Sequence, residues 1–317
     1  MDRVLEEKNA FLFQGIGVRY KEFINVFDES QFNQLEKYSQ IIKSELDIDL
    51  WSYVNKNTNS EDGDEFLEWI LIYTCDCIVY KTYIEKGIKP EIMVGYSMGL
   101  ITAMVCAEVL SYENGLRLLD SIYKYPIQSK RTEEAMATII GLDYDSIFQI
   151  IEDVNLEEYV EIASENSEYC IVISGIKNAV NKIMELAEEE GAVKVIKLNA
   201  AYAFHSSFAL IGIEILENLI KNIEINKAKV SIMSIFTQNI IKDEAQLRNE
   251  LIINMYTSMK WKDTILKLGE LGINKFLEVT LNDSLTKMSR IIDLEYKFMA
   301  FKEVTKKNKT EYIKRGL

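Results

Sequence analysis

The stretch EIMVGYSMGLITAMVCAEVL constrains the fold more than any other part of this 317-residue chain. Residues 91–95 are mostly apolar and predict a short buried strand, and residues 100–110 are mostly small or apolar and predict a helix. Ser97 lies between them, flanked by Gly95 and Gly99. A sharp strand–turn–helix junction needs glycines at these positions because a side chain there would collide with the strand or the helix. The stretch therefore predicts an α/β fold with a serine exposed on a tight turn.

The lone histidine of the chain is the natural partner of this serine. A serine hydroxyl is a weak nucleophile at neutral pH and needs a nearby base. The sequence contains 1 histidine, His205 in the stretch AYAFHSSF. An imidazole can accept the serine proton and later return it. We therefore predict that Ser97 is a nucleophile and that His205 is its base.

The middle of the chain predicts a separate small unit. Its elements follow the order β-α-β-β-α-β, which is that of a ferredoxin-like fold; they are strand 136–142, helix 145–154, strands 159–166 and 170–176, helix 177–191 and strand 192–199. The remaining predicted elements form a larger α/β body around this insertion; they are strand 11–14, helices 20–45, 66–86 and 208–223, and strands 230–236, 275–280 and 297–301.

Composition and charge exclude several classes of function. Apolar residues make up 48% of the chain and charged residues 27%, as in packed globular proteins. The net charge is −14 and no basic stripe with interleaved aromatic residues occurs, so we expect no nucleic-acid partner. No apolar run is long enough for a membrane span. Four cysteines lie in apolar runs without metal-ligand spacing, so we expect reduced thiols, no metal site and a cytoplasmic location; they are Cys75, Cys77, Cys106 and Cys170.

Several stretches in order resemble the malonyl-CoA:acyl-carrier-protein transacylase family, which includes polyketide synthase acyltransferases. The resemblance covers nearly the whole chain, and its stretches are FLFQGIGVRY (11–20), GIKPEIMVGYSMGLITAMVCAEVLS (87–111), EEAMATIIGL (133–142), SENSEYCIVISG (164–175), YAFHSSF (202–208), MYTSMKW (255–261) and KFLEVTLNDSL (275–285). The resemblance implies a hydrolase-like large subdomain with a parallel sheet, residues 1–132 and 202–317, and an inserted ferredoxin-like small subdomain, residues 133–201.

The resemblance also implies a mechanism. Ser97 would attack an acyl thioester of a carrier protein or of CoA and hold the acyl group, with His205 acting as base and then as acid. Backbone N–H groups of Met98 and Ile16 would form the oxyanion hole, and Asn166 would support the site. The family uses a backbone carbonyl, and not an aspartate, to orient the histidine. No cofactor would be bound permanently, and the partner would be an acyl carrier protein whose phosphopantetheine thiol accepts the acyl group.

Departures from the family pattern bear on the substrate. Malonyl-type members hold the substrate carboxylate with an arginine, and the alignment places Ile122 at that position, with Arg117 at a different one. An isoleucine would leave a carboxylate desolvated and unpaired. Tyr96 replaces the usual histidine before the nucleophile. We therefore expect an uncharged acyl group in a substrate pocket formed by Ile122, Tyr96, Phe204 and Asn166.

Three functions agree with these features. The first is an acyltransferase for a non-malonyl acyl group in polyketide or fatty-acid-type biosynthesis. The second is an acyl-carrier-protein hydrolase, which would use the same serine and histidine and would resemble arginine-lacking hydrolases of polyketide pathways. The third is a binding module without catalysis, which does not need the serine, the turn glycines and the histidine together. Carrier proteins are usually acidic, so a basic patch would have to receive one, and Lys130 and Arg131 are the candidates.

Overall fold

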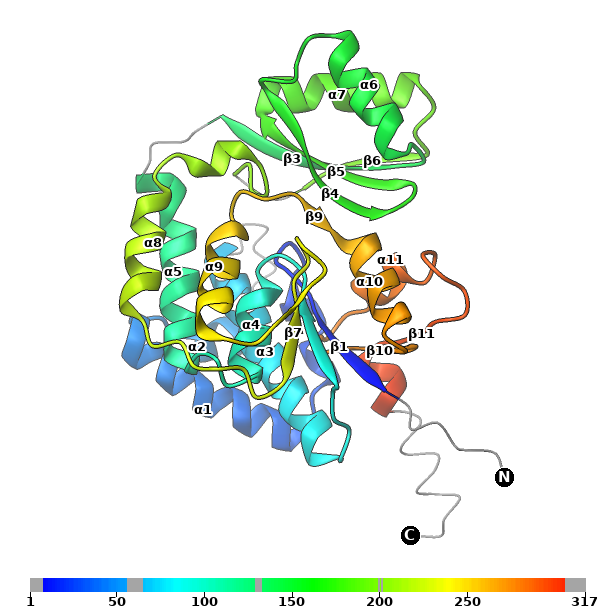
Figure 1. Ribbon diagram of the computed structural model, residues 1–317. Coiled ribbons are helices and arrows are strands. Elements are labelled where there is room, and N and C mark those ends of the chain that lie inside the picture. Colours follow the sequence, from blue (N-terminus) through cyan, green and yellow to red (C-terminus); the bar gives the residue numbers. More distant parts are fainter. Residues whose placement is uncertain (1–7, 56–64, 129–132, 199, 201, 306–317) are drawn as a thin grey trace, which may run out of the picture.

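The computed structural model describes residues 8–55, 65–128, 133–198, 200 and 202–305 (Figure 1). The larger of its two sheets has the strand order β11-β10-β1-β2-β7-β8. These strands are β1 (Asn9–Phe13), β2 (Ile92–Gly95), β7 (Ser231–Met233), β8 (Ile240–Ile241), β10 (Lys275–Glu278) and β11 (Lys297–Met299). Neighbouring strands run parallel, except for the antiparallel pair β7–β8. The predicted mixed α/β class with a parallel sheet is therefore confirmed.

Helices cover both faces of the larger sheet (Figure 1). They are α1 (Glu29–Leu46), α2 (Leu50–Asn55), α3 (Glu65–Glu85), α4 (Gly99–Cys106), α5 (Tyr112–Gln128), α8 (Ile213–Asn222), α9 (Glu244–Ile253), α10 (Trp261–Glu270) and α11 (Ser284–Ser289). Side chains of β1 alternate between the two faces. Phe11 and Phe13 join the core with α3, α4 and α5, and Ala10 and Leu12 join a second core with Trp261 of α10.

The smaller sheet has the order β6-β3-β5-β4-β9. Its first four strands are antiparallel and follow the ferredoxin-like order, with α6 (Tyr144–Asp153) and α7 (Lys177–Glu189) as its helices. These strands are β3 (Glu134–Ile140), β4 (Val160–Ser167), β5 (Cys170–Ile176) and β6 (Lys194–Lys197). The fifth strand, β9 (Met259–Lys260), runs parallel to β4 and was not predicted. On the basis of these two sheets we propose the division into residues 133–201 and the flanking segments 1–132 and 202–317.

Two predicted helices differ from the structure for local reasons. The helix expected over 20–45 begins only after Asp28, whose side chain accepts the backbone N–H of Gln31 while the Gln31 side chain accepts that of Asp28. Short 3₁₀ turns occupy the preceding residues. The helix expected over 208–223 is interrupted at Gly212, whose φ of 85° cannot continue a right-handed helix.

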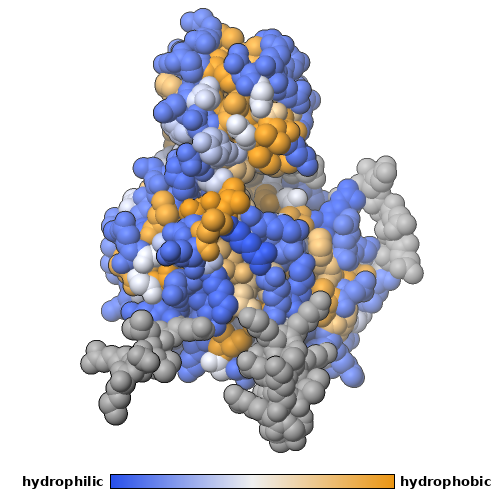
Figure 2. All heavy atoms as spheres, turned by 90° about the vertical axis from the view of Figure 1, so that its right-hand side faces the viewer, coloured by the Kyte–Doolittle hydropathy of each residue, from blue (hydrophilic) through white to orange (hydrophobic). Residues whose placement is uncertain are grey.

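The unit built on the smaller sheet projects from the larger body (Figure 2). Hydrophilic residues cover most of the body on the face shown, and apolar residues reach the surface just below the junction of the two parts. Among the described residues, none of the helices combines the length and the hydropathy that crossing a membrane requires.

Candidate active site

Ser97 lies on the predicted tight turn between β2 and α4, with a φ of 55°. The glycines on either side are there for a steric reason. A Cβ atom on Gly95 would lie 2.2 Å from the Cα atom of Leu100, and one on Gly99 would lie 2.2 Å from the carbonyl oxygen of Phe13. The turn therefore closes only with glycine at both positions, and it holds Ser97 in a left-handed conformation that non-glycine residues rarely adopt.

His205 faces Ser97 from the segment that follows the smaller unit. Its Nε2 atom is 2.8 Å from the Ser97 hydroxyl oxygen, which is hydrogen-bond distance. His205 as a whole is 2% exposed. His205 also has a positive φ, 58°, and its backbone N–H donates to the carbonyl of Met255 at 2.7 Å. The structure therefore brings the two predicted residues together in the geometry of a nucleophile and its base.

Burial lowers the pKa of His205 from 6.5 to about 4, and backbone groups of Thr257 and Asn254 partly oppose this shift. The imidazole is therefore neutral at physiological pH. For Nε2 to accept the Ser97 proton, Nδ1 must carry the ring hydrogen. Nδ1 is buried, and no acceptor among the described residues meets ordinary hydrogen-bond geometry with it. Backbone groups of Thr257 and Asn254 lie close enough to the ring to favour its charged form.

The lowered pKa of His205 predicts an unusual pH dependence. If the neutral imidazole is the base, single-turnover acylation of Ser97 stays constant from about pH 8 to about pH 5 and falls only as the pH approaches about 4. The free energy of unfolding should also fall as the pH is lowered from 6.5 to about 4, because in this range the unfolded chain binds a proton that the folded chain does not. Quenched intact-mass kinetics measure the rate, and urea unfolding at each pH controls for loss of structure. An inflection near pH 6.5 would contradict the prediction.

The loop after β1 lies against the nucleophile. A Cβ atom on Gly15 would be 3.1 Å from the Cβ atom and 3.6 Å from the hydroxyl oxygen of Ser97. Ile16 follows in this loop, and Met98 follows Ser97 at the start of α4. Within the described part of the chain, the N–H groups of Met98 and Ile16 donate no hydrogen bond. Both N–H groups are therefore free to serve as the oxyanion donors that the sequence predicts.

A series of buried hydrogen bonds anchors the loop after β1. The Gln14 side chain donates to the Tyr20 hydroxyl at 2.7 Å, and that hydroxyl donates to Asp76 of α3 at 2.7 Å. The backbone N–H of Leu281 donates to the same hydroxyl at 3.3 Å. Burial raises the pKa of Asp76 well above its ordinary value. These hydrogen bonds tie both ends of the loop to α3 and to the segment that follows β10.

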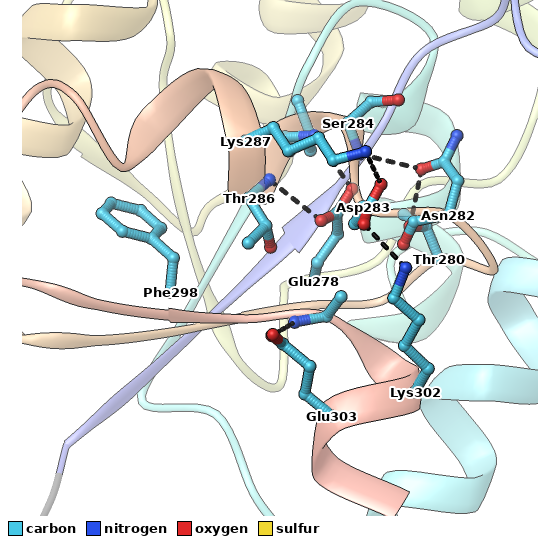
Figure 3. Close-up of polar contacts among 12 residues, drawn as sticks. Glu278, Thr280, Asn282, Asp283, Ser284, Thr286, Lys287, Phe298, Lys302 and Glu303 are labelled. Atoms are coloured by element: carbon cyan, nitrogen blue, oxygen red, sulfur yellow. Dashed lines mark hydrogen bonds and ion pairs between the residues drawn. The ribbon is translucent and has the colours of Figure 1, made fainter.

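The segment that follows β10 is itself anchored by carboxylates (Figure 3). Glu278, at the end of β10, accepts the backbone N–H groups of Leu285 and Thr286 at 2.9 Å each, which satisfies donors at the start of α11. Asp283 forms ion pairs with Lys287 at 2.9 Å and Lys302 at 2.7 Å. The segment after β10 is therefore tied to β10 and to the start of α11 by hydrogen bonds and surface ion pairs.

Tyr96 and Asn166 form a direct pair. The Tyr96 hydroxyl donates to the Asn166 side-chain oxygen at 3.0 Å, and the Ser164 hydroxyl donates to the same oxygen at 2.7 Å. The Tyr96 ring packs edge-on against Trp261, with ring centroids 5.4 Å apart. Burial raises the pKa of Tyr96 to about 12, so its hydroxyl stays protonated and can donate. The pair links the residue before the nucleophile to β4 of the smaller sheet.

Ile122 and Phe204, the other two residues of the predicted substrate pocket, lie in the large apolar core. Each is 3% exposed, and both belong to the cluster that contains Trp69 and Tyr123. Trp69 lies 6.4 Å from Phe204 and 5.3 Å from Tyr123 between ring centroids. Arg117 pairs with Glu45 at 2.7 Å on the surface. Ile122, which the resemblance places where malonyl-type members have an arginine, therefore has apolar surroundings.

Sequence reasoning missed Asn254. Its side-chain nitrogen donates to the carbonyl oxygen of Ser97 at 3.2 Å, and its backbone lies beside the ring of His205. The signal that could have found it is its position directly before the stretch MYTSMKW. The predicted basic pair Lys130 and Arg131 lies outside the described residues. No cluster of three histidine, cysteine or acidic side chains able to hold a metal occurs within the described ranges.

Comparisons with known sequences identify the family. The profile of the family described as acyl transferase domain matches residues 73–288. The malonyl CoA-acyl carrier protein transacylase of Buchnera aphidicola is 27% identical over 313 residues, which cover 93% of this chain and 98% of that protein. Polyketide biosynthesis protein PksE of Bacillus subtilis is 25% identical over 298 residues, which cover 93% of this chain and 36% of that protein.

Solved structures show the same fold. The malonyl CoA-acyl carrier protein transacylase of Coxiella burnetii aligns with a TM-score of 0.83 and 25% identity, covering 95% of each chain. A malonyl-transacylase solved in complex with its type II polyketide synthase acyl-carrier protein aligns with a TM-score of 0.82 and 22% identity, covering 93% of this chain and 96% of that one. Because the family profile matches more than half of the chain and spans Ser97 and His205, the protein belongs to the acyl transferase domain family and is an acyltransferase.

Proposed function

We propose that this acyltransferase moves an uncharged acyl group from a thioester, through an acyl-Ser97 intermediate, to the phosphopantetheine thiol of an acyl carrier protein. The single observation that carries the proposal is the 2.8 Å contact between the Ser97 hydroxyl and Nε2 of the neutral, buried His205. A carrier-protein partner is supported by the fold neighbour solved with its acyl-carrier protein. Four cysteines without disulfides support a cytoplasmic location.

The proposed reaction has two half-reactions of the same form. As the Ser97 oxygen attacks the thioester carbonyl, Nε2 of His205 takes the serine proton. The N–H groups of Met98 and Ile16 stabilise the oxyanion. The carbon–sulfur bond then breaks, and the departing thiolate takes the proton from His205. In the second half, His205 takes the proton of the carrier thiol and the sulfur attacks the acyl-serine carbonyl. The carbon–oxygen bond to Ser97 then breaks, and the Ser97 oxygen takes the proton from His205.

The uncharged substrate is supported by the surroundings of Ile122. Ile122 is buried within the large apolar cluster, so a carboxylate at this position would have apolar surroundings. A buried carboxylate without a cation or hydrogen-bond donors carries a large desolvation cost. An acyl chain without charge would instead gain from burial in such surroundings. The polar donors of the site, Tyr96 and Ser164, are directed at Asn166.

The distinguishing experiment offers the enzyme acetyl, longer acyl and malonyl thioesters of carrier protein, together with an empty acceptor carrier. Intact-mass analysis follows the enzyme, donor and acceptor over time. The expected result is a Ser97-dependent acyl adduct that decays as the acceptor becomes loaded. Free acid with an unloaded acceptor would instead assign the protein as an acyl-carrier-protein hydrolase. Carrier binding without adduct or turnover would assign a binding module.

Replacing Ile122 with arginine is expected to shift selectivity toward malonyl. A guanidinium at this position could bind a malonyl carboxylate with two hydrogen bonds, so the ratio of malonyl to acetyl loading should rise about tenfold or more. The variant should also lose stability without substrate, because the charge is then buried and unpaired. Ile122→Met is the matched control, since it conserves volume without charge. Faster loading of malonyl than acetyl by the unaltered enzyme would contradict the proposed substrate.

A further inference from the structure

Three adjacent strands of the smaller sheet present polar side chains on one face. Glu134 lies on β3, Ser174 on β5 and Glu161 on β4. Glu161 is directly paired with Ser174, and Ser174 is paired on its other side with Met136, two residues from Glu134. Paired residues, and residues two apart on a strand, share a face of a sheet. The three polar side chains therefore form a row across one face of this sheet.

This row contacts the segment that carries His205. The backbone N–H of Ala203 donates to Glu134 at 2.7 Å, and that of Ser207 donates to Glu161 at 3.0 Å. The Ser207 hydroxyl donates to the same Glu161 carboxylate. The two carboxylates thus bind backbone groups two residues before and two residues after the histidine.

Ser206 contacts the middle of the row, between the two glutamates. Its side chain is fully buried and its hydroxyl donates to the carbonyl of Ala203 at 2.8 Å. The same hydroxyl lies 3.5 Å from that of Ser174 in the row. Residues 203, 206 and 207 are therefore each held by side-chain hydrogen bonds, and His205 lies within this held turn.

The turn needs such support because His205 is in a strained conformation. Its φ of 58° is one that a residue with a Cβ atom adopts only when its surroundings hold it there. That backbone conformation directs the imidazole to Ser97. From the larger part, the carbonyl of Met255 adds one hydrogen bond to the His205 N–H. The hydrogen bonds of Ala203, Ser206 and Ser207 described above come from the turn itself or from the smaller sheet.

We propose that Glu134 and Glu161 are positioning residues that fix the turn 203–207 and thereby hold the imidazole of His205 at Ser97. The inference rests on the proposed role of His205 as the base. The carboxylates act by accepting backbone N–H groups and not by placing charge near the ring. The pKa of His205 is accordingly governed by burial and by backbone groups of Thr257 and Asn254.

The test uses the fact that the chain contains 1 histidine. In untagged protein labelled with ¹³C,¹⁵N-histidine, the imidazole NMR signals belong to His205 alone. The variants are Glu134→Ala with Glu161→Ala, the same pair changed to glutamine, and Glu158→Ala as an exposed acidic control near β4. Glutamine retains a side-chain oxygen that can accept the N–H group, and its amide can donate to the Ser207 hydroxyl.

The expected result separates the alanine pair from the others. In the alanine pair the His205 signals should broaden or divide, its pKa should rise from about 4 toward 6.5 as water reaches the ring, and acylation of Ser97 should slow about 10- to 100-fold. The glutamine pair and Glu158→Ala should match the unaltered enzyme. If the alanine pair does not fold, each single alanine variant is compared with its glutamine counterpart.

Failure of this inference and failure of the proposed function give different results. Unchanged His205 signals and an unchanged rate in the alanine pair would overturn the positioning role. Altered His205 signals with an unchanged acylation rate would support the positioning of the turn while overturning His205 as the base. Loss in the glutamine pair equal to that in the alanine pair would show that charge, and not hydrogen bonding, is required, and would also overturn the inference.

Discussion

Changing Ser97 to alanine is expected to abolish the acyl-enzyme and to lower the transfer rate by about 10³-fold or more, as for other enzymes that lose a serine nucleophile. The reason is chemical, because His205 then faces a methyl group and no hydroxyl is 2.8 Å from Nε2. Folding should be little affected, since the change removes one oxygen and keeps the Cβ atom. Intact-mass analysis after incubation with an acyl carrier protein measures the adduct, and circular dichroism measures the fold.

Ser111→Ala is the matched control for this prediction. Ser111 precedes α5, and its hydroxyl accepts the backbone N–H of Asn114 at 3.0 Å on the surface. Losing this cap should reduce stability by about 1 kcal/mol and leave the adduct intact. An acyl adduct of normal yield in the Ser97 variant would place the nucleophile elsewhere and would remove the basis of the proposed mechanism.

Changing Gly99 to alanine should produce the largest loss of stability among the variants considered. The new Cβ atom would lie 2.2 Å from the carbonyl oxygen of Phe13 and 2.5 Å from that of Gln14. These are backbone atoms of β1 and of the loop beside Ser97, so relief requires moving the central strand against β2 and β10. We expect the free energy of unfolding in urea to fall by about 3 kcal/mol, together with loss of the acyl adduct.

Gly87→Ala separates collision from conformational strain. Gly87 follows α3 with a φ of 75°, and nothing lies within 4 Å of its added Cβ atom. Alanine there should cost only the strain of the left-handed conformation, about 1 kcal/mol, and should leave acylation unchanged. Equal destabilisation by the two changes would show that the turn at Ser97 tolerates a side chain.

The local elements of this protein could be predicted from the sequence because each depends on residues close together in the chain. The strand–turn–helix around Ser97 is specified by an apolar run, two glycines and a second apolar run. The start of α1 is also local, but the prediction placed it too early. The reciprocal hydrogen bonds of Asp28 and Gln31 set the helix start, and such bonds cannot be predicted from apolar periodicity.

The contacts that complete the candidate site could not be predicted in the same way. His205 was assigned as the partner of Ser97 by elimination, since the chain has 1 histidine. Asn254 and Glu161, in contrast, are polar residues of common types, and their contacts with Ser97 and Ser207 arise only when distant segments meet. The two-residue strand β9 is too short to carry a periodic signal, and its pairing with β4 depends on tertiary structure.

The pairing of β9 with β4 also limits how this protein can be recombined. Exchanging residues 133–201 with those of a relative would leave Met259 and Lys260 of the recipient at the edge of the foreign sheet. The donated β4 would then pair with the β9 of a different protein. If the two strands do not match, β4 becomes an exposed edge strand. A chimera in which only residues 133–201 are exchanged is therefore expected to aggregate or lose activity. Exchanging the segment that carries β9 as well should restore both the sheet and the activity.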